Sequence, residues 1–216
     1  VLSDKKINNN QLIIPAPMAV GAVHHKLIEN GLRCDTNIIV ETGSARNPHH
    51  YAVLIGYGAT AIYPYLAFEV LNEMVTKNKI NVKNYGVSLS NYIAGINKGL
   101  LKIMSKMGIS CISSYRGAQL FEIVGLDKTI IDLCFKDTVS RISGSDFSDI
   151  EEDLEENRMY AWDINKEIKT GGLLKYVHNE EYHDYNPDVV KTLHECVSSG
   201  KFEDYIKYAD LINNRD

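Results

Sequence analysis

The sequence contains no long apolar run. Its most apolar stretches are interrupted by residues such as His24, His25 and Lys26, well short of the roughly 20 residues that a membrane-spanning helix needs. It also lacks an excess of basic residues, since 23 Lys and Arg are scattered among 28 Asp and Glu and the net charge is −5. Nucleic acid is bound by clustered cations. We therefore expect neither a membrane nor a nucleic acid as a partner.

Closely spaced cysteines are also absent. The four cysteines lie far apart, without the short spacing of a zinc site or an iron–sulfur cluster. Free thiols of this kind indicate a reducing compartment, which predicts a cytoplasmic location. The chain opens with VLSDKK, with neither an initiator Met nor a signal peptide, so we expect Val1 to be an internal residue of a longer protein. The cysteines are Cys34, Cys111, Cys134 and Cys196.

Strand-like and helix-like segments alternate over roughly the first 125 residues. The segment at residues 37–43 is almost wholly apolar and rich in β-branched residues, which is typical of a strand buried on both faces of a parallel sheet. The helices that follow the first two strands have a Pro or Asn at their start. This order predicts parallel strands joined by right-handed crossovers, with Val40, Ile62 and Ile112 buried in one sheet. The predicted strands are residues 37–43, 59–63 and 109–114, and the predicted helices are residues 15–31, 48–58, 65–77, 91–107 (capped by Ser90) and 115–125.

The rhythm changes beyond Gly125. We predict a short helix, a loop over residues 140–146, an acidic helix over residues 149–162, a small extended pair near residues 173–185, and two final helices. The predicted fold class is therefore α/β. A partial TIM-like (β/α) barrel with parallel strands spans residues 1–145, and a helical and extended linker spans residues 146–216.

Two pairs of adjacent histidines suggest a metal site at first sight. Neighbouring helical residues point about 100° apart, however, so a pair cannot easily place both rings on one ion. We therefore interpret His24, His25, His49 and His50 as histidines hydrogen-bonded within the fold, and we predict no metal ligands in this chain.

The loops that follow barrel strands are where chemistry is expected. Gly43 lets the backbone approach a ligand closely, so the loop at residues 41–45 resembles a short phosphate cradle, but a single Gly is weak support. Arg116 could clamp an anion, or it could pair with Glu41 across the barrel mouth, which we favour. No nucleophile motif surrounds Ser113, Ser114 or Cys111. The residues alone indicate a partial barrel without a complete active site.

Long blocks of the sequence resemble the large subunit of glutamate synthase. They are residues 15–33, 40–69 and 91–126, with further similarity at residues 181–194 and 205–215. The resemblance implies a central domain that connects an amino-terminal glutaminase domain to a domain that binds flavin mononucleotide (FMN) and a 3Fe–4S cluster. The loop VETGSARNPHH resembles the NAD(P)H-dependent branch more than the ferredoxin branch, which implies a small NAD(P)H-oxidising subunit as a further partner.

The resemblance assigns no catalytic, cofactor-binding or metal-binding residue to this chain. It implies that residues 1–145 connect the two sites, that residues 146–216 lead into the flavin domain, and that the segment alone is inactive. We expect a role in the ammonia passage or in interdomain contact for Glu41, Ser44, Ser114, Tyr115 and Arg116. Two alternatives stay open, which are a free-standing flavin- or phosphate-binding barrel enzyme and a pure interaction module.

Overall fold

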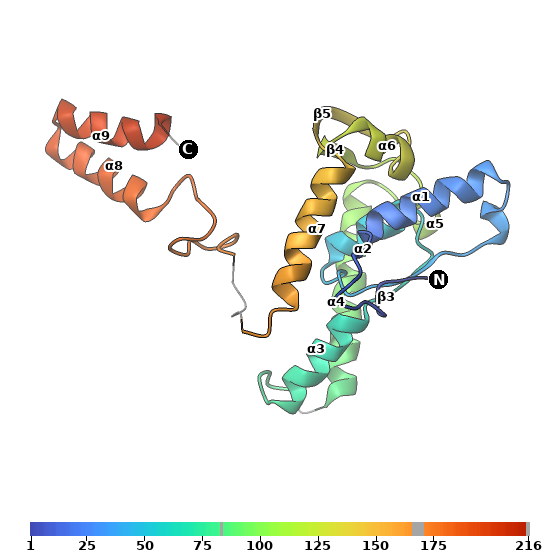
Figure 1. The fold of residues 1–216 in the computed structure, drawn as a ribbon. Helices are drawn as coiled ribbons and strands as arrows, with labels where there is room; N and C mark the ends of the chain where they lie inside the picture. The colour runs from blue at the N-terminus through green and yellow to red at the C-terminus, as the bar shows by residue number, and fades with distance from the viewer. Residues whose placement is uncertain (83, 166–170, 215–216) are drawn as a thin grey trace. The chain divides into compact units, whose positions relative to one another are not determined.

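The computed structural model describes residues 1–82, 84–165 and 171–214 (Figure 1). The chain divides into two compact units, Val1–Asp163 and Ile164–Asp216. None of the helices described over these ranges is long and apolar enough to cross a membrane. Each unit is described separately below.

A three-stranded parallel sheet begins the first unit. Its strands β1 (Leu2–Ser3), β2 (Ile39–Glu41) and β3 (Ala61–Tyr63) lie side by side in that order. Helix α1 (Ala16–Glu29) and the 3-10 turn η1 (Arg33–Asp35) connect β1 to β2, and helix α2 (Pro48–Gly56) connects β2 to β3. The predicted parallel pairing of residues 37–43 with residues 59–63 is confirmed.

One face of this sheet carries the main core. Val20 of α1 and Leu54 of α2 pack with Val40 of β2, and all three are buried. The opposite face is open, because Ile39 is 41% exposed and Tyr63 is 45% exposed. The prediction that the central strand is buried on both faces is therefore wrong, since both crossover helices pack against the same side of the sheet.

Two helices follow the sheet, α3 (Tyr65–Thr76) and α4 (Tyr85–Lys106), and they pack against each other. Asn84 caps α4 by accepting a hydrogen bond from the Gly86 N–H at 2.7 Å. The helix thus begins six residues before the predicted start, and Ser90 lies inside it. No residue of α3 is fully buried, although Phe68, Leu71, Met74 and Val75 are half-buried.

The region after α4 differs most from expectation. Residues 109–114, predicted as a fourth strand, contain the start of the short helix α5 (Ile112–Tyr115), and Ile112 is exposed. Residues 115–125, predicted as a helix, contain most of β4 (Glu122–Leu126). The predicted loop at 140–146 contains most of β5 (Val139–Ser145), which pairs with β4 in parallel.

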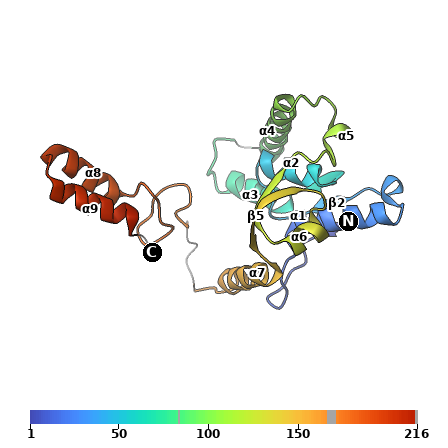
Figure 2. The same ribbon diagram turned by 90° about the horizontal axis from the view of Figure 1, so that it is seen from above.

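Helix α6 (Lys128–Cys134) connects β4 to β5 and packs on α1, as Figures 1 and 2 also show. The five strands form two separate parallel sheets in the described part of the chain. The fold is therefore mixed α/β with small parallel sheets and no closed barrel. The half-barrel prediction failed because the fourth predicted strand does not pair with β3, and the next βαβ unit builds its own sheet.

Acidic helix α7 (Phe147–Ala161) ends the first unit and is present as predicted. Asp146 caps it by accepting hydrogen bonds from Ser148 N at 2.7 Å and Asp149 N at 3.1 Å, and the Asp149 side chain accepts one from Asp146 N, which forms a capping box.

The second unit contains a helical hairpin of α8 (Pro187–Ser199) and α9 (Phe202–Asn213). Asn186 caps α8, and Gly200 ends it in the left-handed conformation. The predicted extended pair at residues 173–185 is wrong, because the structure assigns no strand to these residues. Residues 166–170 and 215–216 of the predicted linker lie outside the described residues.

Candidate functional site

The carboxyl ends of β1 and β2 bring together a group of polar residues. Asp4, just after β1, accepts hydrogen bonds from the Thr42 hydroxyl at 2.5 Å and from the Gly43 N–H at 3.0 and 3.2 Å. The Thr42 hydroxyl also accepts the Ser44 N–H at 3.1 Å. The Asp4 carboxylate thus holds the turn that follows β2, although 38 residues separate it from Thr42.

Tyr65 completes this group from the start of α3. Burial raises the pKa of Tyr65 to about 12, and the neighbouring Asp4 carboxylate adds to the effect. A Cβ atom at Gly43 would lie 3.1 Å from the Tyr65 hydroxyl, so the turn and the phenol ring approach closely. The N–H that a phosphate cradle would offer at Gly43 is therefore already bound by the chain's own carboxylate.

Glu41 lies beside this group and has its own partners. It accepts a hydrogen bond from the Ser3 hydroxyl at 2.5 Å, and Lys5 Nζ lies 3.9 Å from its carboxylate. Within the described residues, no ion pair joins Arg116 to a carboxylate. The predicted Glu41–Arg116 pair is therefore wrong.

The five predicted passage residues fall into two separate groups. Glu41 and Ser44 lie together at the carboxyl edge. Ser114, Tyr115 and Arg116 belong to α5 and the residue after it. Tyr115 is only 1% exposed and packs with buried residues of α2 and α4.

Arg116 lies near the opposite edge of the sheet. Its positive charge lowers the pKa of both His24 and Arg33. Arg33 donates to the carbonyl groups of Thr36 and Gly58, which precede β2 and β3. The structure therefore does not bring Arg116 to the carboxyl edge of the sheet, where Glu41 and Ser44 lie.

A groove of about 770 Å³ opens beside Gly43 and Ser44. Most of its lining is apolar, and Asp4, Ser44, Tyr65, His49 and His50 supply the polar part. The His50 Nδ1 accepts the Arg46 N–H at 3.2 Å, and burial lowers the pKa of His50. The apolar side is formed by Ile7, Ile13, Pro15, Ala16, Pro17, Ala45, Val53, Leu54, Leu66 and Leu154.

The chemistry that this groove can perform is limited. Its carboxylate and hydroxyl groups bind one another, and no group of three metal-ligating side chains occurs over the described residues. Sequence reasoning missed Asp4 and Tyr65, because no local pattern indicates a contact across so many residues.

The chain matches a known protein family. The family described as "Glutamate synthase central domain" matches residues 1–127, more than half of the chain. The chain belongs to this family. Glutamate synthases are oxidoreductases, so this chain corresponds to a segment of such an enzyme.

Individual relatives extend the match over the whole chain. A ferredoxin-dependent glutamate synthase of Antithamnion sp. is 40% identical over 228 residues, covering 100% of this chain. The glutamate synthase [NADPH] large chain of Bacillus subtilis is 40% identical over 215 residues, covering 97%. A chloroplastic/mitochondrial ferredoxin-dependent enzyme of Arabidopsis thaliana is 39% identical, covering 100%.

These relatives are much longer than this chain. The matches cover 14 to 15% of their lengths. They include both NADPH-dependent and ferredoxin-dependent proteins at nearly equal identity.

Proposed function

We propose that this chain is the connecting part of a glutamate synthase, an enzyme that makes glutamate from glutamine and 2-oxoglutarate. In the whole protein it would join a glutaminase domain to a domain that holds FMN and a 3Fe–4S cluster. The chain itself would have an architectural role and no catalytic residues. Residues 1–145 would connect the domains, and residues 146–216 would lead into the flavin domain.

The observation that carries this proposal is the closed set of hydrogen bonds at the carboxyl edge of the sheet. The groups that could act on a substrate, above all the Asp4 carboxylate and the Thr42 hydroxyl, bind each other and the Gly43 N–H. Such an arrangement fixes a turn instead of presenting a reactive group. The match to a central domain over residues 1–127 supports the same role.

The groove beside this turn is proposed to form part of the wall of the ammonia passage. Ammonia must travel uncharged, because an apolar wall excludes the ammonium ion and an unpaired charge would stabilise the protonated form. The mainly apolar lining supports this proposal, and the Asp4 carboxylate, which keeps its charge, is held by hydrogen bonds from the neutral Thr42 hydroxyl and Gly43 N–H. Glu41 and Ser44 lie at this edge, and we propose Ser114 and Arg116 as candidates for interdomain contact.

A charge placed in the groove tests the proposal in the whole enzyme. Leu66 lines the groove and is 44% exposed, whereas Val70 lies one turn further along α3, is 45% exposed and does not line it. Leu66→Asp should lower the glutamate formed per glutamine consumed, while Val70→Asp should leave this ratio unchanged. Glutaminase activity and ammonia-dependent synthesis, assayed separately, should persist in both variants.

Two outcomes would contradict the passage. If Leu66→Asp leaves the glutamate formed per glutamine consumed unchanged, the groove is not part of the ammonia passage. If this ratio falls equally in Leu66→Asp and Val70→Asp, the added charge acts in a general way and not through the groove. Arg116→Ala gives an independent comparison, because Arg116 lies near the other edge. A lowered ratio in Arg116→Ala alone would place the passage there instead.

The loop at residues 40–50 leads us to propose NAD(P)H as the electron source, through a small NAD(P)H-oxidising subunit. The support is the resemblance of this loop to the NAD(P)H-dependent branch. Glutamate formation by the whole enzyme with NADPH, NADH or reduced ferredoxin tests it directly, and activity with ferredoxin alone would refute it.

The alternative of a free-standing flavin enzyme is tested with the isolated chain. The proposal expects the purified chain to be colourless. Close to one equivalent of flavin retained after desalting would favour the alternative.

A further inference from the structure

The loop between β1 and α1 lies between two cavities at the carboxyl edge of the three-stranded sheet. We call residues 5–14 of this loop the strap. It adjoins both the groove of about 770 Å³ described above and a second cavity of about 450 Å³. Ile7 and Ile13 of the strap line both cavities, as do Asp4 and Ala16 at its ends. The strap is therefore the partition that the two cavities share, and it lacks the close packing that fixes a core segment.

Most hydrogen bonds of the strap are internal. The Asn8 carbonyl accepts the Gln11 N–H at 3.2 Å, and the Asn8 side chain accepts the Asn10 N–H at 2.9 Å. These bonds shape a turn but do not attach it to the rest of the unit. Lys5 anchors the start of the strap, since its Nζ lies 3.9 Å from the Glu41 carboxylate, and α1 follows at the other end.

One bond from another element holds the middle of the strap. Arg158 of α7 donates from Nη1 to the Asn9 carbonyl, and the loop lies beside α7 in Figure 2. Among the described residues, residues 6–14 make no other hydrogen bond to a residue outside the strap. Glu155 accepts hydrogen bonds from Arg158 Nε at 2.8 Å and from Nη2, which orients the guanidinium toward Asn9.

Helix α7 also contributes to the groove itself. Leu154 lines the groove and lies four residues before Arg158 on α7. Residues four apart lie on the same face of a helix. One face of α7 thus both walls the groove and holds the strap, so a displacement of this helix acts on both.

We propose that the strap is a gate of the groove and that Arg158 of α7 is its latch. While Arg158 holds Asn9, Ile7 and Ile13 keep the two cavities apart. When Arg158 releases Asn9, the middle of the strap moves out between its anchored ends, which joins the cavities and opens the groove to water. The consequence rests on the proposed function, because an open gate lets ammonia escape from the passage.

Trypsin tests the latch in the full 216-residue chain, because the strap contains Lys5 and Lys6. A protease needs several residues of extended chain, so the rate of cleavage after Lys6 follows the population of the open gate. Arg158→Gln should raise this rate roughly tenfold, the effect of losing one charge-assisted hydrogen bond. Glu155→Gln should raise it by a smaller factor, because the guanidinium stays but loses its orientation. Mass spectrometry measures the loss of residues 1–6.

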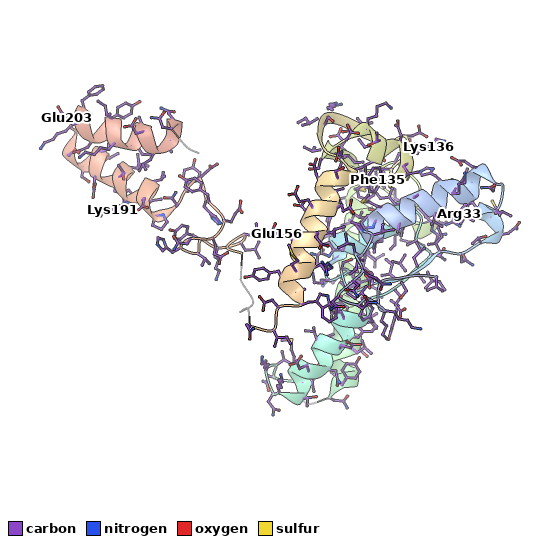
Figure 3. All side chains as sticks on the ribbon, in the orientation of Figure 1. Arg33, Phe135, Lys136, Glu156, Lys191 and Glu203 are labelled. Carbon is purple, nitrogen blue, oxygen red and sulfur yellow. The ribbon has the colours of Figure 1, made fainter. Side chains whose placement is uncertain are left out.

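Matched controls are available for both variants. Glu156, labelled in Figure 3, neighbours Glu155 on α7, is exposed and is not among the described contacts of Arg158 or the strap. Arg141 lies on β5 with an 80% exposed side chain. Glu156→Gln and Arg141→Gln should leave the cleavage after Lys6 unchanged. Cleavage after Lys102, inside α4, reports global unfolding and should be unchanged in every variant.

Three results would overturn the latch. They are an unchanged rate of cleavage after Lys6 in Arg158→Gln, an equal rise in the control variants, or an equal rise of cleavage after Lys102. A rise that is confined to Arg158→Gln and Glu155→Gln supports it.

The whole enzyme separates the gate from the passage. Arg158→Gln should lower the glutamate formed per glutamine consumed, whereas Arg141→Gln should not. If Leu66→Asp lowers this ratio but Arg158→Gln does not, the strap is not a gate. If neither variant changes the ratio, the groove is not the ammonia passage and the proposed function fails there, while faster cleavage after Lys6 in Arg158→Gln still supports the latch.

Discussion

The contact between α1 and α6 can be tested at a single glycine. Gly21 is buried on α1, and a Cβ atom there would lie 1.8 Å from the Cys134 carbonyl oxygen of α6. Gly21→Ala therefore requires the two helices to separate by more than about 1 Å. Overpacking against a rigid backbone costs up to about 3 kcal/mol, while the Gly-to-Ala change in a helix returns up to about 1 kcal/mol. We expect a net loss of about 2 kcal/mol, or roughly 6 °C in melting temperature for a chain of this size.

Gly95→Ala is the matched control. Gly95 lies inside helix α4, where an added Cβ atom meets nothing within 4 Å. This variant should be more stable than the original by about 0.5 to 1 kcal/mol, because only the backbone entropy changes. Urea unfolding of both variants measures the difference. Equal stability of the two variants would show that α1 and α6 do not approach as closely as the structure indicates.

Three further predictions concern the polar groups. Asp4→Ala should lower the free energy of unfolding in urea by about 2 kcal/mol, because it leaves the Thr42 hydroxyl and the Gly43 N–H without their acceptor. Asp132→Ala, which removes an exposed ion pair with Lys128, should cost about 0.5 kcal/mol or less. Equal losses would refute the role of Asp4. Burial, followed by the charges of Arg33, His25 and Arg116, lowers the pKa of His24 from 6.5 to about 4. Between these two pH values His24 binds a proton in the unfolded chain but not in the folded chain, so the free energy of unfolding should decrease as the pH falls. His24→Gln should reduce this loss between pH 6.5 and pH 4, and an unchanged pH dependence of unfolding would contradict it. Tyr115→Phe should be neutral or stabilising by about 1 kcal/mol, because it removes a buried hydroxyl without a partner among the described residues; a marked drop in melting temperature would reveal a missed partner.

The sequence by itself determined the helices whose ends are set locally. Asn47 and Pro48 begin α2, and Asn186 and Pro187 begin α8, because an Asn side chain caps the first free N–H groups and Pro suits the first helical turn. Gly200 ends α8 by adopting a positive φ. Each of these features depends on residues within one turn, so the pattern along the chain is sufficient.

The tertiary structure decided which short segments become strands and which groups meet. Residues 140–146 carry turn-like Ser and Gly, yet most of them belong to β5, because β4 supplies a parallel partner across the α6 crossover. Residues 109–114 are strand-like in composition but find no such partner, and α5 begins there instead. A parallel strand is stable only beside a partner that is distant in sequence, and Asp4 likewise reaches Gly43 only because β1 and β2 pair side by side. Interactions of this kind leave no local pattern, so only the folded chain shows them.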